Sequence, residues 1–79
     1  MIDKLDFIEK FKNEFLDVED IEFNADTKFR DLDSWDSLTG MAIIVMLEDN
    51  YNLKLTVDKF EKTNTVGEIY NHLVELKNN

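Results

Sequence analysis

Residues 36–49 read DSLTGMAIIVMLED, a run of eleven uncharged residues between acidic ends. Asp36 suits a helix N-cap, because its carboxylate can accept hydrogen bonds from the free amides of a first turn. We therefore predict a helix from Ser37 to about Asn50, with Ser37 at the positive end of its dipole. The run is apolar on nearly every side, as in a fully buried helix, yet a 79-residue bundle cannot bury every side of it.

Two rows of this predicted helix satisfy the helical period. The first row consists of Gly40, Ile43, Ile44, Leu47 and Tyr51. The second row consists of Leu38, Met41, Ala42, Val45 and Glu48. One row should pack on the core and the other should face a partner, and the residues alone permit both orientations.

The chain before this helix divides into a helix and a loop. The helix is capped by Asp3 and ends near Leu16, with Phe7 beside an inward row of Leu5, Ile8, Phe11 and Phe15. Residues 17–36 hold eight acids and two basic residues, and their apolar side chains are too sparse for an amphipathic helix: Val18, Ile21, Phe23, Phe29 and Leu32. We predict a loop that these side chains pin to the bundle. Loops of this length in small domains are either functional or evidence that the elements are wrongly assigned, and we favour a functional loop.

Two further helices are predicted after residue 56. A short helix over residues 57–61 points Phe60 inward. Thr65 and Glu68 have the spacing of a capping box, and the helix that they open has an apolar side of Val66, Ile69, Tyr70, Leu73 and Leu76. The sequence thus predicts one all-α domain, residues 1–79. It is a four-helix bundle, with three longer helices, one short helix and a long loop between helices 1 and 2.

The composition limits the classes of function. The net charge of −9 repels nucleic acid and anionic lipid and favours basic protein partners. The lack of cysteine excludes thiol catalysis and disulfides and fits a reducing cytoplasm. The uncharged run at residues 37–47 is shorter than the ~20 residues of a membrane span, and the mixed N-terminus does not resemble a secretory signal. We expect a cytoplasmic monomer.

Catalysis and metal binding have little support in the sequence. The only histidine, His72, has no evident companion that would activate Ser37 in the manner of a triad. An EF-hand loop beginning at Asp31 would have Asp36 in place of the required glycine and no glutamate at its last position. The acids lie on an open loop without a cleft that could raise a carboxyl pKa for hydrolysis. We therefore expect no catalytic residue, no metal ligand and no enzymatic activity.

The order and spacing of these features resemble the acyl carrier protein family. In that family the phosphopantetheine serine lies in an Asp-Ser-Leu motif at the start of the second of four helices, here Asp36-Ser37-Leu38. Further similar positions are Asp26, Phe29 and Leu32 in the loop, Leu47-Glu48-Asp49 at the helix end and Thr65-Val66. The resemblance implies that a phosphopantetheinyl transferase attaches 4′-phosphopantetheine to Ser37, beside Asp36 and Leu38. The arm then holds an acyl group as a thioester for enzymes of fatty acid or related biosynthesis.

The resemblance also orients the second helix, with Ile44 and Leu47 inward. Its outward residues would dock on basic patches of partner enzymes: Leu38, Met41, Val45, Glu48 and Asp49. Thr39 and Ala42 stand where the family often has acids, so this row is unusually apolar and leaves open a specialised pathway. Phe60 stands where the family often has a smaller side chain facing the acyl cavity, which implies a narrower pocket.

Two alternatives stay open. Trp35 either closes the loop over the bundle or contacts the arm. The competing hypothesis for the whole domain is an unmodified acidic interaction module that docks on a basic protein through its apolar second helix. That module would leave Ser37 without an arm.

Overall fold

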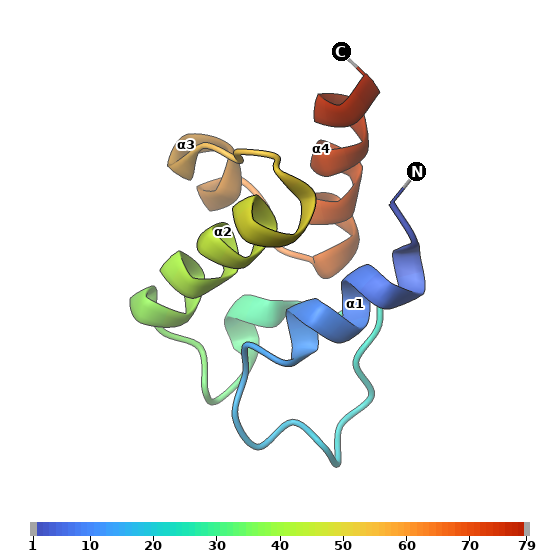
Figure 1. Cartoon of the computed structure of the whole chain (residues 1–79). Coiled ribbons are helices and arrows are strands. Elements are labelled where there is room, and N and C mark those ends of the chain that lie inside the picture. Colours follow the sequence, from blue (N-terminus) through green and yellow to red (C-terminus); the bar gives the residue numbers. More distant parts are fainter. Residues whose placement is uncertain (1, 79) are drawn as a thin grey trace.

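The computed structural model describes residues 2–78, which contain four α-helices, a short 3-10 helix and the segments that connect them (Figure 1). The elements are α1 (Lys4–Lys12), η1 (Phe29–Asp31), α2 (Ser37–Tyr51), α3 (Val57–Glu61) and α4 (Val66–Asn78). Within the described residues no strand forms, and Lys28 and Thr65 make only an isolated antiparallel bridge. The predicted all-α fold, with three longer helices, one short helix and a long loop before α2, is confirmed.

The predicted end of the first helix near Leu16 is wrong. α1 ends at Lys12, and Asn13 is its C-cap. Beyond the cap, the Phe15 amide donates to the Lys12 carbonyl at 3.0 Å, a tight turn that leaves the α-helical pattern. This turn stacks the Phe15 ring on Phe11, with ring centroids 5.9 Å apart. The helix therefore stops early because Phe15 reaches the core from a turn.

The inward face of α1 also differs from the prediction at one position. Phe7 and Phe11 are fully buried, whereas Leu5 is 80% exposed. At 3.6 residues per turn, Leu5 lies about 200° round the helix from Phe7. The row that buries Phe7 and Phe11 thus leaves Leu5 on the opposite side.

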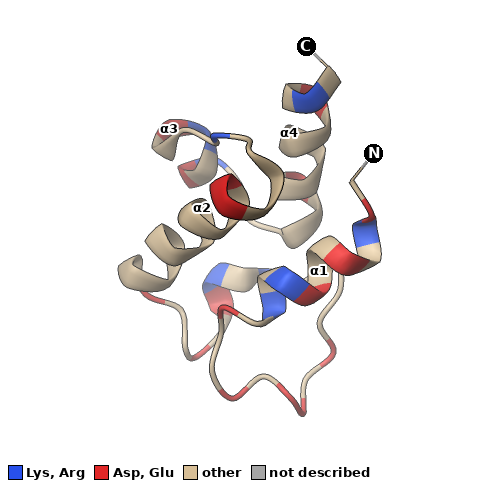
Figure 2. Cartoon of the chain, in the orientation of Figure 1, with Lys and Arg blue, Asp and Glu red and all other residues tan. Residues whose placement is uncertain are grey.

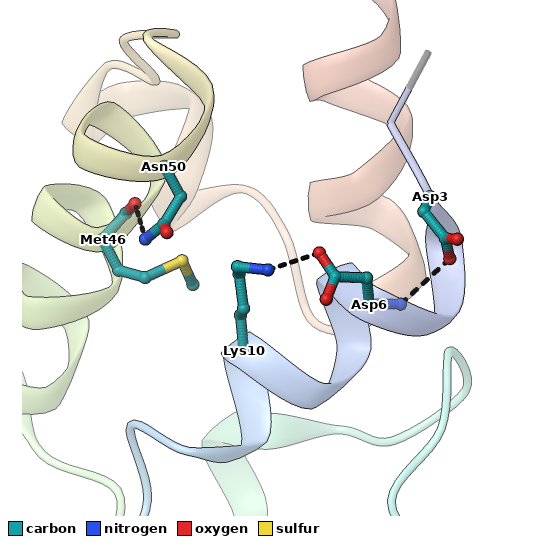
Figure 3. Close-up of polar contacts among 5 residues, drawn as sticks. All are labelled: Asp3, Asp6, Lys10, Met46 and Asn50. Carbon is teal, nitrogen blue, oxygen red and sulfur yellow. Dashed lines mark hydrogen bonds and ion pairs between the residues drawn. The ribbon is translucent and has the colours of Figure 1, made fainter.

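Local polar contacts support α1 and the end of α2 (Figure 3). The Asp3 carboxylate caps α1 as predicted, accepting from the Asp6 amide at 3.1 Å. The Asp6 carboxylate pairs with Lys10 one turn later, which raises the pKa of Lys10. On α2, the Asn50 side chain donates to the Met46 carbonyl at 2.9 Å. Each of these contacts lies within one helix, so they stabilise the helices individually.

Aromatic rings form the centre of the core. Successive ring centroids lie 5.3–6.1 Å apart along a series that runs from α4 to α3: Tyr70, Phe7, Phe11, Phe29, Trp35 and Phe60. Phe29 and Trp35 belong to the long loop, so part of the loop is built into the core. Phe60 of α3 is buried as predicted.

Four of the five predicted loop anchors reach the core. Val18 and Phe29 are buried, and Phe23 and Leu32 are partly buried against them. Ile21 is exposed instead. The loop is therefore anchored at its start by Val18 and from Phe23 onward, with Ile21 left exposed between these anchors.

Loop carbonyls also cap α4. The amides of Val66 and Gly67 donate to the carbonyls of Thr27 and Ala25, at 3.1 and 2.8 Å. A Cβ at Gly67 would lie 3.0 Å from the Ala25 oxygen, so this close approach favours glycine. These bonds satisfy amides at the start of α4 that would otherwise lack partners.

The predicted capping box of α4 is confirmed. The Glu68 amide donates to the Thr65 hydroxyl oxygen at 3.2 Å, and the Thr65 amide donates to the Glu68 carboxylate at 2.9 Å. Backbone bonds from Asn64 and Thr65 lower the pKa of Glu68. The apolar side of α4 packs inward as predicted, with Tyr70 and Leu76 partly buried and the others buried: Val66, Ile69 and Leu73.

Candidate functional site

The site begins where the loop becomes α2. Asp36 is the N-cap as predicted, and its carboxylate accepts from the Thr39 amide at 2.8 Å and from the Thr39 hydroxyl at 3.0 Å. The hydrogen bond from the Thr39 amide, and after it the bond from the Thr39 hydroxyl, lowers the pKa of Asp36, so its carboxylate is charged near neutral pH. The cap makes Ser37 the first residue of α2. The helix ends at Tyr51, close to the predicted Asn50.

The two serines of the chain lie in opposite settings. Ser37 is exposed at the helix start. The Ser34 hydroxyl oxygen is buried and makes no hydrogen bond to the described part of the chain. An enzyme that modifies a hydroxyl must reach it, and this condition favours Ser37.

A pocket of about 200 Å³ opens beside Ser37, between α2 and α3. The loop before α2, α2 itself and α3 form its walls, and both helices contribute apolar side chains. The main lining residues are Arg30, Trp35, Gly40, Ile44, Val57 and Phe60. Ile44, predicted to face inward, is partly buried against the core and also lines this pocket.

Arg30 is a residue of the site that sequence reasoning missed. Its guanidinium donates to the carbonyls of Phe60 and Thr63, at 2.6 and 2.9 Å. It also lies over the rings of Phe29, Trp35 and Phe60, 5.1–5.2 Å from their centroids. One sequence signal could have pointed to it: Arg30 is the only arginine of the chain and follows Phe29 in a segment rich in acids. It ties the loop to the end of α3.

The two faces of α2 have different surroundings. Gly40, Ile43, Met46 and Leu47 are buried on the inner face. On the outer face Leu38 is 79%, Met41 55% and Val45 53% exposed. Glu48 and Asp49 are also exposed, and Figure 2 shows α2 without charged residues until these acids near its C-terminal end. The structure thus brings the five outward-predicted residues to the surface.

The comparison with known proteins agrees with this geometry. A family model described as the phosphopantetheine attachment site matches residues 9–73. The chain belongs to this family. The match covers most of the chain and confirms the resemblance to acyl carrier proteins, and family membership implies a covalently attached 4′-phosphopantetheine. No solved structure matches the chain.

The residues at the start of α2 fit such a group in this carrier. The Ser37 hydroxyl is exposed, and a helix N-terminus favours the negative charge of a phosphodiester. The apolar pocket beside Ser37 offers a surface for an attached group. When bound, 4′-phosphopantetheine supplies the thiol that holds an acyl group.

Within residues 2–78, the acids of the loop lie apart from one another, and no three acidic or histidine side chains come close enough together to hold a metal ion. Over the same residues, no helix is both long and apolar enough to cross a membrane. Carrier domains of this family are typically non-catalytic, and they interact with modifying and acyl-processing enzymes.

Proposed function

We propose that this carrier is an acyl carrier protein and that Ser37 is the attachment point of its arm. One observation carries the assignment. Ser37 is exposed at the N-terminus of α2 beside an apolar pocket, whereas the hydroxyl of Ser34, the other serine, is buried. Both serines lie within the matched residues 9–73, so accessibility is what distinguishes them.

The attachment is a phosphoryl transfer in which Ser37 is the acceptor. The Ser37 oxygen forms a bond to the phosphorus that carries pantetheine in coenzyme A, and the phosphoanhydride bond breaks. Adenosine 3′,5′-bisphosphate leaves, and the hydroxyl proton passes to the transferase. Asp36 holds the helix start in place through Thr39, and its charge offers a contact for a basic transferase. Leu38 is exposed next to Ser37 and completes the contact surface.

The outer face of α2 is the proposed docking surface. Leu38, Met41 and Val45 supply apolar contacts, and Glu48 and Asp49 attract basic patches on partner enzymes. The pathway is fatty acid or related biosynthesis. The apolar character of this face leaves open a specialised branch, and the composition fits a monomer acting in the cytoplasm.

The test is an intact mass after incubation of the apo protein with coenzyme A and a broad-specificity phosphopantetheinyl transferase. We expect one arm on the parent protein and on Ser34→Ala, and none on Ser37→Ala, which should fold as the parent does by circular dichroism. Ser34→Ala is the matched control, because it removes the other serine hydroxyl. An arm on Ser37→Ala would refute the assignment, and an unmodified parent would favour the interaction module.

A further inference from the structure

We infer that the cargo of this carrier is a small or polar acyl group, because the pocket beside Ser37 ends on a closed aromatic wall. The inference rests on the proposed attachment at Ser37. The wall consists of Trp35 and Phe60 packed against Gly40 of α2. The fully buried Phe29 packs against both rings of the wall, with centroids 5.3 Å from Trp35 and 5.7 Å from Phe60.

The fit between α2 and this wall leaves no room for a further carbon. A Cβ built on Gly40 would lie 3.0 Å from Cη2 of Trp35 and 3.3 Å from Cε2 of Phe60. Both distances are shorter than ordinary carbon contacts, which begin at about 3.5 Å. A saturated chain therefore cannot pass between α2 and the two rings unless the rings move.

Arg30 holds both rings in place. Its guanidinium lies over the Trp35 and Phe60 rings and donates to the backbone carbonyls of Phe60 and Thr63. Phe29 also packs edge-on against Trp35, with centroids 5.3 Å apart. Moving the rings would lose these cation–π and aromatic contacts, while the hydrogen bonds from Arg30 fix the backbone that carries Phe60, so the closed form is the more stable one.

The volume of the pocket sets the size of what it can cover. A buried apolar cavity of about 150 Å³ binds benzene, so a pocket of about 200 Å³ covers a group only slightly larger. A long saturated chain on the arm would stay in water or lie over the exposed apolar side chains of α2. A small or polar cargo avoids this exposure.

The experiment loads the protein with acetyl, butanoyl or hexadecanoyl arms, using the matching acyl coenzyme A and the broad-specificity transferase. Intact mass verifies each product, and thermal unfolding follows. We expect a hexadecanoyl Tm no higher than the butanoyl Tm, because the pocket covers only a small group, and stronger retention of the hexadecanoyl form on a hydrophobic column. A hexadecanoyl form that melts above the butanoyl form would overturn the inference. If Ser37 takes no arm, the proposed function itself fails. If Ser37 is loaded but the Tm result is contrary, only the inference about the cargo fails, so the two failures can be told apart.

A variant that opens the wall sharpens the test. Phe60→Ala should create room behind the pocket, so its hexadecanoyl form should melt above its butanoyl form. Val57→Ala is the matched control, because Val57 lines the same pocket from the exposed side of α3. Its hexadecanoyl form should still melt no higher than its butanoyl form, and a higher hexadecanoyl Tm would contradict the closed wall.

If Phe60→Ala does not fold, amide chemical shifts of the parent protein decide the matter. The shifts of Ile43 and Leu47, two fully buried residues of α2, should agree between the acetyl and hexadecanoyl forms. Shifts that move with chain length would show that the cargo enters the core and would overturn the inference.

Discussion

The inner and outer faces of α2 have similar side chains and opposite surroundings. Ile43 and Leu47 are fully buried, while Leu38, Met41 and Val45 are more than half exposed. Hydrophobicity alone therefore does not determine which face packs on the core. The neighbouring helices and the loop cover one face, and the other keeps an apolar row that a partner can cover.

The largest expected effect on this comparison comes from Leu47→Ala. Removing buried methyl groups from the inner face leaves a cavity and should lower the free energy of unfolding by about 2–4 kcal/mol. Equilibrium denaturation in urea measures the loss. A loss under about 1 kcal/mol would show that the inner face is loosely packed.

Val45→Ala is the matched change on the outer face and should have a smaller effect. The side chain is half exposed, so the loss of stability should be under about 1 kcal/mol. Binding to an acyl-processing enzyme should weaken, because apolar contacts on this face matter only in the complex. If Val45→Ala destabilises as much as Leu47→Ala, the assigned roles of the two faces are wrong.

A smaller effect on stability is expected at Asp36, the N-cap of α2. The folded pKa of Asp36 is depressed, so its charge stabilises the fold above the unfolded pKa, about 4. This contribution is lost as pH falls through the lower folded pKa. Asp36→Asn keeps a good cap without the charge, so its stability should fall less between pH 6 and 3 than that of the parent. If denaturation shows that the free energy of unfolding falls equally with pH in the two proteins, this role of the Asp36 charge is contradicted.

The smallest effect is expected for Glu48→Lys combined with Asp49→Lys. Both residues are exposed at the end of α2, so stability should hardly change. Encounter with a basic partner enzyme should slow, more at low salt than at high salt, because such charges act mainly through steering. Transfer rates that are unchanged at low ionic strength would exclude this end of α2 from docking.

Local signals predicted much of the fold. The caps at Asp3, Asp36 and Thr65 were predictable because each depends on residues within one turn. The orientation of α2 was not, since its residues are apolar on nearly every side and only neighbouring elements select the buried row.

The remaining errors have separate physical causes. Leu5 was assigned inward because the apolar row was extended to Phe15, which actually reaches the core from a turn. Arg30 was missed because a charged residue in an acidic loop is normally solvated. Its partners are carbonyls at Phe60 and Thr63, about thirty residues away.

The bonds between the loop and α4 bear on when the site is completed. They join Thr27 to Val66 and Ala25 to Gly67, separations of 39 (66 − 27) and 42 (67 − 25) residues. Contacts between distant residues form slowly, because a long loop must close before they are made. During synthesis, the hydrogen bonds that hold residues 25–27 can form only after the start of α4 has left the ribosome. A transferase that recognises the fully packed loop would therefore act only on chains from which α4 has emerged.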